Sequence, residues 1–328
     1  MKTIIFSAHN FEKQPLIDAN AGKHELIFLE IPLKKETVYL AKDADAISIF
    51  VNDDASEDVL KILEQAGIKY IALRSAGFNH VNLDVAKKLQ MRLARVSAYS
   101  PYAVAEHAVT LMLALNRNIV RANSRVRDLN FSLENLTGFD MHNKTVGIIG
   151  TGEIGAVAAR ILHGFGCKIL AIDLVENTEL KEKYGVVYTD HTSLYNAADI
   201  ITLHLPLTPE SHYMINSDSL NKMKQGVMLI NTSRGALVNT KDVIKGLKTG
   251  KIGYLGLDVY EQEGGLFFED HSDHILQDDT ISRLLTFKNV LITSHQAFLT
   301  ETALKNIAET TIHNLTCFED GTPCENEI

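Results

Sequence analysis

Residues 145–155 read TVGIIGTGEIG, and this stretch decides the fold. Its apolar start, Val146 to Ile149, predicts a buried strand that leads into the pattern G-x-G-x-x-G, and small apolar residues at helical spacing follow. Residues 168–173, KILAID, predict a second strand that ends in Asp173. The glycine pattern alone also fits a turn without a ligand. Strand, glycine turn, helix, strand and acid together are typical of a dinucleotide-binding unit.

The three glycines of this pattern have different physical tasks. Gly150 permits the tight turn, Gly152 lets a pyrophosphate approach the backbone, and Gly155 lets the helix pack closely against the strand. The helix N-terminus adds free N–H groups and the positive end of the helix dipole. The Asp173 carboxylate would accept a hydrogen bond from a ribose 2′-hydroxyl and would repel a 2′-phosphate, so the stretch predicts NAD rather than NADP.

The composition narrows the class of protein. With 328 residues and 45% apolar content, the chain is long enough for two domains at about 150 residues each. A net charge of −9 argues against a nucleic-acid partner, although local cations would still hold a small anionic substrate. Cys167, Cys317 and Cys324 lack metal-ligand spacing, which predicts free thiols and no metal site. No apolar run approaches the roughly 20 residues of a membrane span, so we expect a cytoplasmic protein with no membrane partner.

Short apolar strands alternate with helices along the chain, which predicts parallel sheets with right-handed crossovers. We therefore expect an α/β fold with two Rossmann-like, doubly wound parallel-sheet domains. Residues 101–298 would form the NAD-binding domain, which opens with a long helix that Ser100 can cap. Residues 1–100 plus 299–328 would form the substrate domain, which is discontinuous because the last helix returns to it.

Polar side chains follow three predicted strands of the NAD-binding domain, at the ends where ligands of open parallel sheets bind. Arg234 lies just after the strand at 227–231, Asp258 ends the next strand, and His295 follows the last one. An arginine fork suits a carboxylate, although a surface ion pair is the alternative. Histidine suits proton transfer near neutral pH, although many histidines at strand ends are only structural. The chain has neither an H-E-x-x-H zinc motif nor the G-x-S-x-G elbow of serine hydrolases.

Eight segments, in order along the chain, resemble the D-2-hydroxyacid dehydrogenase family, and within it most closely the NAD-dependent D-lactate dehydrogenases. They are LRSAGFNHV at 73–81, YSPYAVAEH at 99–107, GTGEIG at 150–155, LHLPLT at 203–208, NTSRG at 231–235, LDVYE at 257–261, LFFED at 266–270 and SHQAF at 294–298. The resemblance covers nearly the whole chain and is more specific for the family than for the substrate. It implies an active site in the cleft between the two domains.

The resemblance also implies a catalytic set of Arg234, Glu263 and His295. Arg234 would bind the substrate carboxylate and polarise the 2-oxo group. His295, paired with Glu263, would donate a proton to the carbonyl oxygen as hydride arrives from NADH, and would act as a base in reverse. The expected reaction is the reduction of pyruvate to D-lactate. The alternatives are a bulkier 2-oxo acid as substrate and a non-catalytic NAD-sensing protein, against which the intact catalytic set argues.

The same resemblance assigns the binding residues and the assembly. The expected substrate contacts are the N–H groups of Ser75, Ala76 and Gly77, the pocket-lining Tyr99 and Phe298, and Arg234 and His295. The expected cofactor contacts are Gly150, Gly152, Glu153, Ile154, Gly155, Asp173, Leu205, Pro206, Thr232, Ser233, Arg234 and Asp258. The resemblance further implies a homodimer or homotetramer, with the helix after Pro101 helping to join the subunits.

The loop that carries the expected catalytic acid departs from the family pattern. Many members have a proline soon after this glutamate, whereas Gly264 and Gly265 follow Glu263 here. This difference loosens the placement of the acid, so Glu261 competes with Glu263 as the partner of His295.

Overall fold

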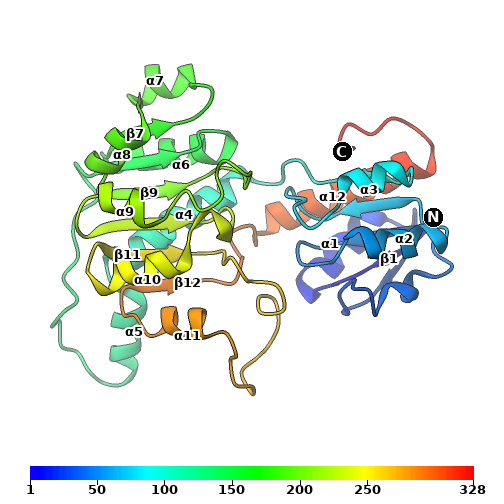
Figure 1. The fold of residues 1–328 in the computed structure, drawn as a ribbon, viewed down its shortest axis with the longest axis horizontal. Helices are drawn as coiled ribbons and strands as arrows, with labels where there is room; N and C mark the ends of the chain where they lie inside the picture. The colour runs from blue at the N-terminus through cyan, green and yellow to red at the C-terminus, as the bar shows by residue number, and fades with distance from the viewer. The chain divides into compact units, whose positions relative to one another are not determined.

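The computed structural model describes residues 1–328, and the chain divides into two compact units (Figure 1). Unit 1 comprises Met1–Ser100 and Leu299–Ile328, and unit 2 comprises Pro101–Phe298. Unit 1 is built on a five-stranded sheet and unit 2 on a seven-stranded sheet, and the strands in both are parallel. The prediction of two parallel-sheet α/β domains is therefore confirmed. None of the helices combines the length and the apolar character that a membrane span requires.

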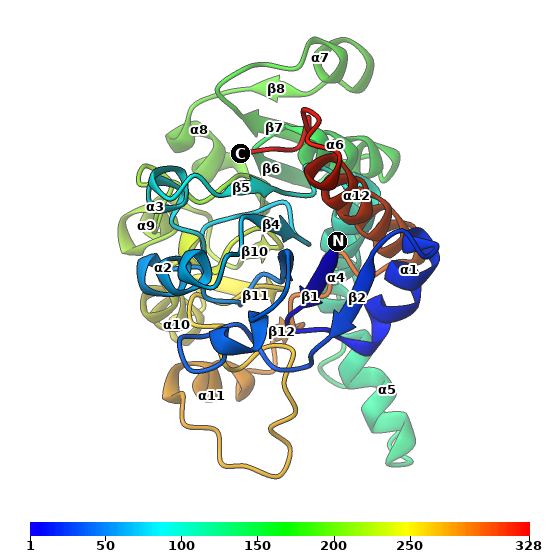
Figure 2. The ribbon, with the colours of Figure 1, turned by 90° about the vertical axis from the view of Figure 1, so that its right-hand side faces the viewer.

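The sheet of unit 1 is covered by helices on both faces, as Figure 2 shows. Its strand order is β2-β1-β3-β4-β5. Helices α2 and α3 and the 3-10 helix η1 pack on one face, and α1 and α12 pack on the other. The elements are β1 Lys2–Ile5, α1 Asn10–Asn20, β2 Glu25–Phe28, η1 Val38–Ala41, β3 Ala46–Ile49, α2 Glu57–Gln65, β4 Tyr70–Leu73, α3 Leu83–Lys88, β5 Arg92–Ala94 and α12 Glu301–Glu319.

Helix α12 ties the end of the chain to the N-terminal sheet. Ile312 and Leu315 are buried on α12 against the small side chains of Ala46 and Ala72 in the sheet. The tail that follows α12 pairs with the edge strand β5, where the Glu327 carboxylate accepts two hydrogen bonds from Arg92 at 2.9 Å. These contacts make unit 1 discontinuous in sequence.

The sheet of unit 2 has the order β12-β11-β10-β9-β6-β7-β8. The chain builds outward from β6 through β7 to β8, and then returns to β9 on the other side of β6 and continues to β12. The switch point between β6 and β9 is where parallel sheets of this kind bind ligands. The elements are α4 Pro101–Asn116, α5 Ile119–Arg127, β6 Thr145–Ile149, α6 Glu153–Gly164, β7 Lys168–Ile172, α7 Thr178–Tyr184, β8 Val187–Tyr188, α8 His191–Ala197, β9 Ile200–Leu203, α9 Ser217–Lys222, β10 Val227–Asn231, η2 Gly235–Leu237, α10 Thr240–Lys248, β11 Ile252–Leu257, α11 Asp279–Leu285 and β12 Val290–Ile292.

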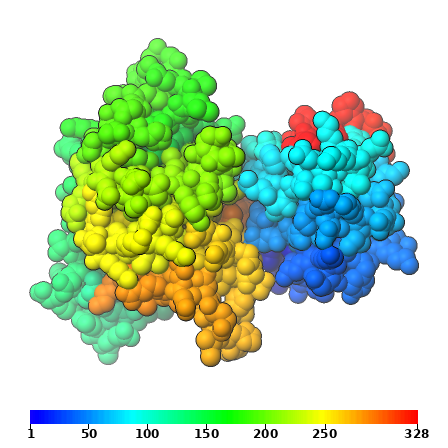
Figure 3. Space-filling model, viewed as in Figure 1, coloured from blue at the N-terminus to red at the C-terminus, as the bar shows by residue number.

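An arm extends from unit 2 between α4 and β6, and Figure 3 shows it in teal at the lower left. It consists of α5, which has no buried residue, and the loop at 128–140. Leu129, Phe131 and Leu133 in this loop are 79%, 69% and 82% exposed. Such a cluster of exposed large apolar side chains is typical of a surface that contacts another molecule.

Candidate active site

The three expected catalytic residues lie after three neighbouring strands of unit 2. Strand β11 is hydrogen-bonded to β10 on one side and to β12 on the other, and all three are parallel. Arg234 lies three residues after the end of β10, Glu263 lies in the loop after β11, and His295 lies three residues after the end of β12. Because the carboxyl ends of parallel strands meet at one edge of a sheet, the topology gathers these residues at that edge.

His295 is bound to Glu263. The distance from His295 Nδ1 to Glu263 Oε1 is 2.9 Å, and the two side chains are only 15% and 19% exposed. Because a carboxylate only accepts, Nδ1 carries a hydrogen, and no residue of the chain bonds Nε2. Glu263 is fixed in turn, because its Oε2 accepts a hydrogen bond from the N–H of Tyr260 at 3.2 Å. The pair therefore presents the Nε2 atom to whatever binds beside it.

Glu261, the competing acid, has other surroundings. It lies beside Tyr213, and burial together with this carboxylate raises the pKa of the Tyr213 hydroxyl. The ring of Phe268, and not Glu261, lies beside the His295 ring, and the two ring centroids are 5.9 Å apart. The structure thus pairs His295 with Glu263 and not with Glu261.

Arg234 is half-buried and has no carboxylate as an ion-pair partner. One of its Nη atoms donates to the carbonyl of Ser233 at 2.7 Å. The next residue, Gly235, lies directly against the backbone of the loop that leads to Glu263, since a Cβ at Gly235 would lie 2.0 Å from the carbonyl carbon of Tyr260. The arginine loop and the glutamate loop are therefore in backbone contact, and the guanidinium remains available to an anion.

Asp258, an expected cofactor contact, is also bonded to the turn that carries His295. Its side chain is completely buried, and its carboxylate accepts from Thr293 Oγ1 at 2.5 Å and from the N–H groups of Gln296 and Ala297 at 2.9 Å. His107 Nε2 lies 3.4 Å from the same carboxylate. Burial opposes ionisation, but these hydrogen bonds outweigh it and lower the pKa of Asp258 below its usual value. These hydrogen bonds tie the Asp258 side chain to the turn that carries His295.

The residues expected at the substrate carboxylate follow β4 in unit 1. The carbonyl oxygens of Ser75, Ala76 and Gly77 all accept hydrogen bonds, from Val96 N, Arg95 Nη1 and Ser75 Oγ at 3.1, 2.8 and 2.7 Å. The N–H groups of the same three residues donate to no acceptor of the chain. A fixed loop with consecutive free N–H groups is a suitable anion-binding site.

A buried ion pair holds the start of this loop. The two expected pocket residues, Tyr99 and Phe298, lie near the ends of segments of the two units. Arg74 Nε donates to Glu12 at 2.9 Å, and both side chains are almost fully buried. Tyr99 is half-buried near the end of the first segment of unit 1, where its carbonyl accepts from Asn306 at 2.6 Å. Phe298 is buried as the last residue of unit 2.

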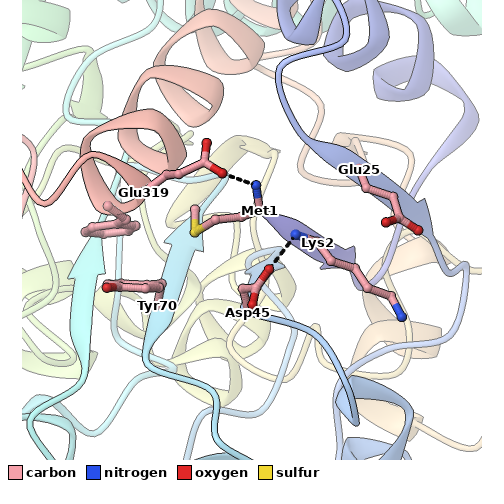
Figure 4. A pocket seen from close by; sticks show the side chains of 7 residues that line it. Met1, Lys2, Glu25, Asp45, Tyr70 and Glu319 are labelled. Atoms are coloured by element: carbon pink, nitrogen blue, oxygen red, sulfur yellow. Dashed lines mark hydrogen bonds and ion pairs between the residues drawn. The ribbon is translucent and has the colours of Figure 1, made fainter.

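Unit 1 also has a hollow of about 600 Å³ (Figure 4). It lies at the amino ends of the strands, and three of its charged groups are already partnered. The Met1 amino group binds Glu319, and Asp45 accepts from the N–H of Lys2 at 2.7 Å. Because ligands of parallel sheets bind at the carboxyl ends, this hollow is not the candidate active site.

Comparison with known proteins agrees with this geometry. The profile of the D-isomer specific 2-hydroxyacid dehydrogenase NAD binding domain matches residues 109–297. The chain belongs to the D-isomer specific 2-hydroxyacid dehydrogenase family. A curated D-lactate dehydrogenase of Escherichia coli is 50% identical over 329 residues, and the match covers 100% of each chain. Among solved structures, the apo form of the Escherichia coli D-lactate dehydrogenase has a TM-score of 0.91 at 47% identity, with 100% of each chain covered. The pyruvate reductase of Chlamydomonas reinhardtii has a TM-score of 0.93 at 45% identity, with 99% of this chain and 98% of that chain covered.

Dehydrogenases of this family use NAD, and the glycine turn after β6 fits a dinucleotide. Gly150 has φ of 92°, and a Cβ there would lie 2.2 Å from the carbonyl oxygen of His204. A Cβ at Gly155 would lie 1.9 Å from the carbonyl oxygen of Gly150, so both glycines are required by the protein itself. A Cβ at Gly152, the N-cap of α6, would meet no protein atom within 4 Å. The space above Gly152 is therefore open, as close approach of a pyrophosphate requires.

The other polar groups around this turn also fit NAD. Asp173 ends β7 and accepts hydrogen bonds from Thr151 N at 2.5 Å and Leu174 N at 2.6 Å. Burial alone raises the pKa of Asp173, but these hydrogen bonds outweigh it and keep the pKa below its usual value. The carboxylate is therefore negatively charged, as an acceptor for a ribose hydroxyl must be. Thr232, just after β10, has a buried Oγ1 with no partner in the chain. The protein is an NAD-dependent oxidoreductase that acts on D-2-hydroxy acids, and the groups around this turn fit its cofactor.

Proposed function

We propose that the protein is a D-lactate dehydrogenase, which reduces pyruvate to D-lactate with NADH and catalyses the reverse reaction. The observation that supports this most is the combination of an arginine with no carboxylate partner and a histidine–glutamate pair after adjacent strands. A 2-oxo acid needs a cation for its carboxylate and a proton donor for its carbonyl oxygen, and this set provides both. The relatives named D-lactate dehydrogenase and pyruvate reductase support pyruvate as the 2-oxo acid.

Arg234 would bind the substrate carboxylate. Its planar guanidinium makes two parallel N–H···O bonds to a carboxylate and stays charged at any working pH. The free N–H groups of Ser75, Ala76 and Gly77 would bind the same anion. A substrate held at its carboxylate in this way has its 2-oxo group fixed in direction, which is the orientation that proton and hydride transfer require.

His295 would move the proton. When bound, NADH supplies the hydride that reduces the carbonyl carbon. His295 gives its Nε2 proton to the carbonyl oxygen as negative charge develops there, and Glu263 stabilises the charged ring from the Nδ1 side. In the reverse direction the neutral ring takes the proton from the 2-hydroxyl group.

The cofactor would be held at the carboxyl edge of the sheet of unit 2. Gly150, Gly152 and Gly155 form the turn, with the helix N-terminus of α6 facing the phosphates. Asp173 would bind a ribose hydroxyl. The remaining contacts that we propose are Glu153, Ile154, Leu205, Pro206, Thr232, Ser233, Arg234 and Asp258, together with Tyr99 and Phe298 as walls of the substrate pocket.

The test is an NADH oxidation assay with a panel of 2-oxo acids and chiral analysis of the product. We expect pyruvate to have the highest kcat/KM and to give D-lactate. A bulkier 2-oxo acid as the best substrate would overturn the substrate assignment, since one methylene is worth only about 1–3 kcal/mol of discrimination. Tight NADH binding without turnover of any acid would instead favour an NAD-sensing protein.

We also propose that the protein is a cytoplasmic homodimer or homotetramer. The three cysteines are free and buried, which is compatible with a reducing compartment. Leu129, Phe131 and Leu133 on the arm of unit 2 supply an apolar surface that another subunit would cover. Light scattering should give two or four times the monomer mass, and serine at these three positions should reduce it. A monomer at all concentrations would contradict this assembly.

A further inference from the structure

The turn that carries His295 has a strained backbone. His295 has φ of 49°, in the left-handed region that residues with a Cβ rarely adopt. Such a conformation persists only where the surrounding structure holds it, and it is common at active sites. The contacts that hold this turn therefore determine where the imidazole lies.

Asp258 holds the turn at His295 and at the two residues that follow it. Its main-chain oxygen accepts from the N–H of His295 at 2.7 Å, and its two carboxylate oxygens accept from the N–H groups of Gln296 and Ala297 at 2.9 Å. Asp258 thus accepts hydrogen bonds from three consecutive N–H groups. The position of the imidazole depends on the position of the Asp258 carboxylate.

The carboxylate depends in turn on two side chains that face its Oδ1 atom. Thr293 Oγ1 donates its only hydrogen to Oδ1 at 2.5 Å. His107 Nε2 lies 3.0 Å from Thr293 Oγ1 and 3.4 Å from Oδ1. Because the hydroxyl hydrogen is already used and a carboxylate cannot donate, His107 Nε2 must carry the hydrogen and donate to this pair of oxygens.

We propose that His107, which lies on α4 far from the strand ends in sequence, is a positioning residue for His295. It completes the hydrogen-bond shell of the buried Asp258, and through Asp258 it holds the 293–297 turn. His107 does not contact substrate or cofactor in this scheme. The proposal rests on the proposed function, because it assumes that the placement of His295 limits turnover.

The consequence is a specific kinetic signature. Without the donor, the carboxylate is left buried with one partner fewer and shifts toward other donors, and the turn shifts with it. A displacement of about 1 Å at a reacting group costs on the order of 10²-fold in rate. The loss falls on kcat and kcat/KM together, since the interaction of His295 with the substrate oxygen is strongest in the transition state.

The experiment compares His107→Leu, which removes the donor, with His107→Gln, which keeps an N–H group at a similar reach. We expect His107→Leu to lose on the order of 10²-fold in kcat, with NADH Kd and pyruvate KM unchanged. His107→Gln should recover most of that loss. Glu106→Gln, on the exposed side of the same helix, is the matched control and should behave like the wild type.

Thr293→Val and Thr293→Ser form a second pair in case His107→Leu does not fold. Valine removes the hydroxyl and serine keeps it, so the valine variant should show the same kcat loss and the serine variant should not. Wild-type kcat in His107→Leu, equal losses in the leucine and glutamine variants, or a loss confined to NADH Kd would overturn the proposal. An inactive wild-type enzyme would instead overturn the proposed function, which separates the two failures.

Discussion

Gly235 offers a sharp test of how the active site is assembled. A Cβ at this position would lie 2.0 Å from the carbonyl carbon of Tyr260, 2.2 Å from its oxygen and 2.3 Å from the nitrogen of Glu261. All three are backbone atoms, so no side-chain rotation relieves the clash. To restore an ordinary carbon–carbon contact of about 3.5 Å, the two loops in Gly235→Ala must separate by about 1.5 Å. This movement would separate Arg234 on one loop from Glu263 and its partner His295.

The expected loss follows from that displacement. A misplacement of 1 Å costs on the order of 10²-fold in rate, which corresponds to about 2.7 kcal/mol in the activation free energy. We expect Gly235→Ala to lose at least this much in kcat/KM, and overpacking of this kind to lower the free energy of unfolding by about 1–3 kcal/mol. NADH Kd should change less than kcat/KM, because the glycine turn after β6 is untouched.

The matched control is Gly264→Ala in the second of the two loops. A Cβ at Gly264 meets no atom within 4 Å, so this variant should keep both its melting temperature and its kcat/KM. Steady-state kinetics with pyruvate and NADH, together with thermal unfolding, measure both variants. Gly235→Ala with wild-type kinetics, or Gly264→Ala with an equal defect, would refute the argument that backbone contact between the loops positions the catalytic groups.

Four further substitutions test the cofactor site and the partner of the proton donor. Gly152→Ala should raise the NADH Kd by tenfold or more, which is about 1.4 kcal/mol of binding free energy. It should not lower the melting temperature, because the new methyl group meets no protein atom within 4 Å. An unchanged Kd in a fluorescence titration would mean that no pyrophosphate approaches there. Asp173→Ala should reduce the preference for NADH over NADPH by roughly 10- to 100-fold, since it removes a charged hydrogen-bond acceptor worth about 1.5–3 kcal/mol; an unaltered ratio of kcat/KM values would count against the ribose contact. Glu263→Gln should lower kcat by on the order of 10²-fold, whereas Glu261→Gln should have a small effect, and the reverse order would show that the wrong acid has been assigned.

The nucleotide-binding turn could be predicted from sequence because its requirements are local. Gly150 and Gly155 are needed by contacts within one strand–turn–helix unit, so the glycine pattern carries that information directly. The placement of Arg234 and His295 at one edge could also be predicted, because parallel strands end on the same side. Local pattern and simple topology thus account for the fold and for much of the candidate site.

Other features depend on contacts between segments that are distant in sequence. Asp258 lies beside His107, which α4 brings to it from about 150 residues earlier, and nothing near Asp258 in the sequence indicates this. The choice of Glu263 over Glu261 depends on how the loop after β11 folds back on Tyr260. Helix α1 is not evident from its sequence, because it is polar and has Pro15 inside it. Its Glu12 is instead fixed by the buried Arg74 of β4's loop.

The most direct test of the account is the effect of His295→Gln on the reduction of pyruvate. We expect kcat/KM to fall by about 10²–10⁴-fold, while the NADH Kd stays at the wild-type value, because the variant loses the proton donor and keeps the cofactor site. Turnover at the wild-type rate in His295→Gln would contradict the account, since the hydride acceptor would then gain its proton from another source.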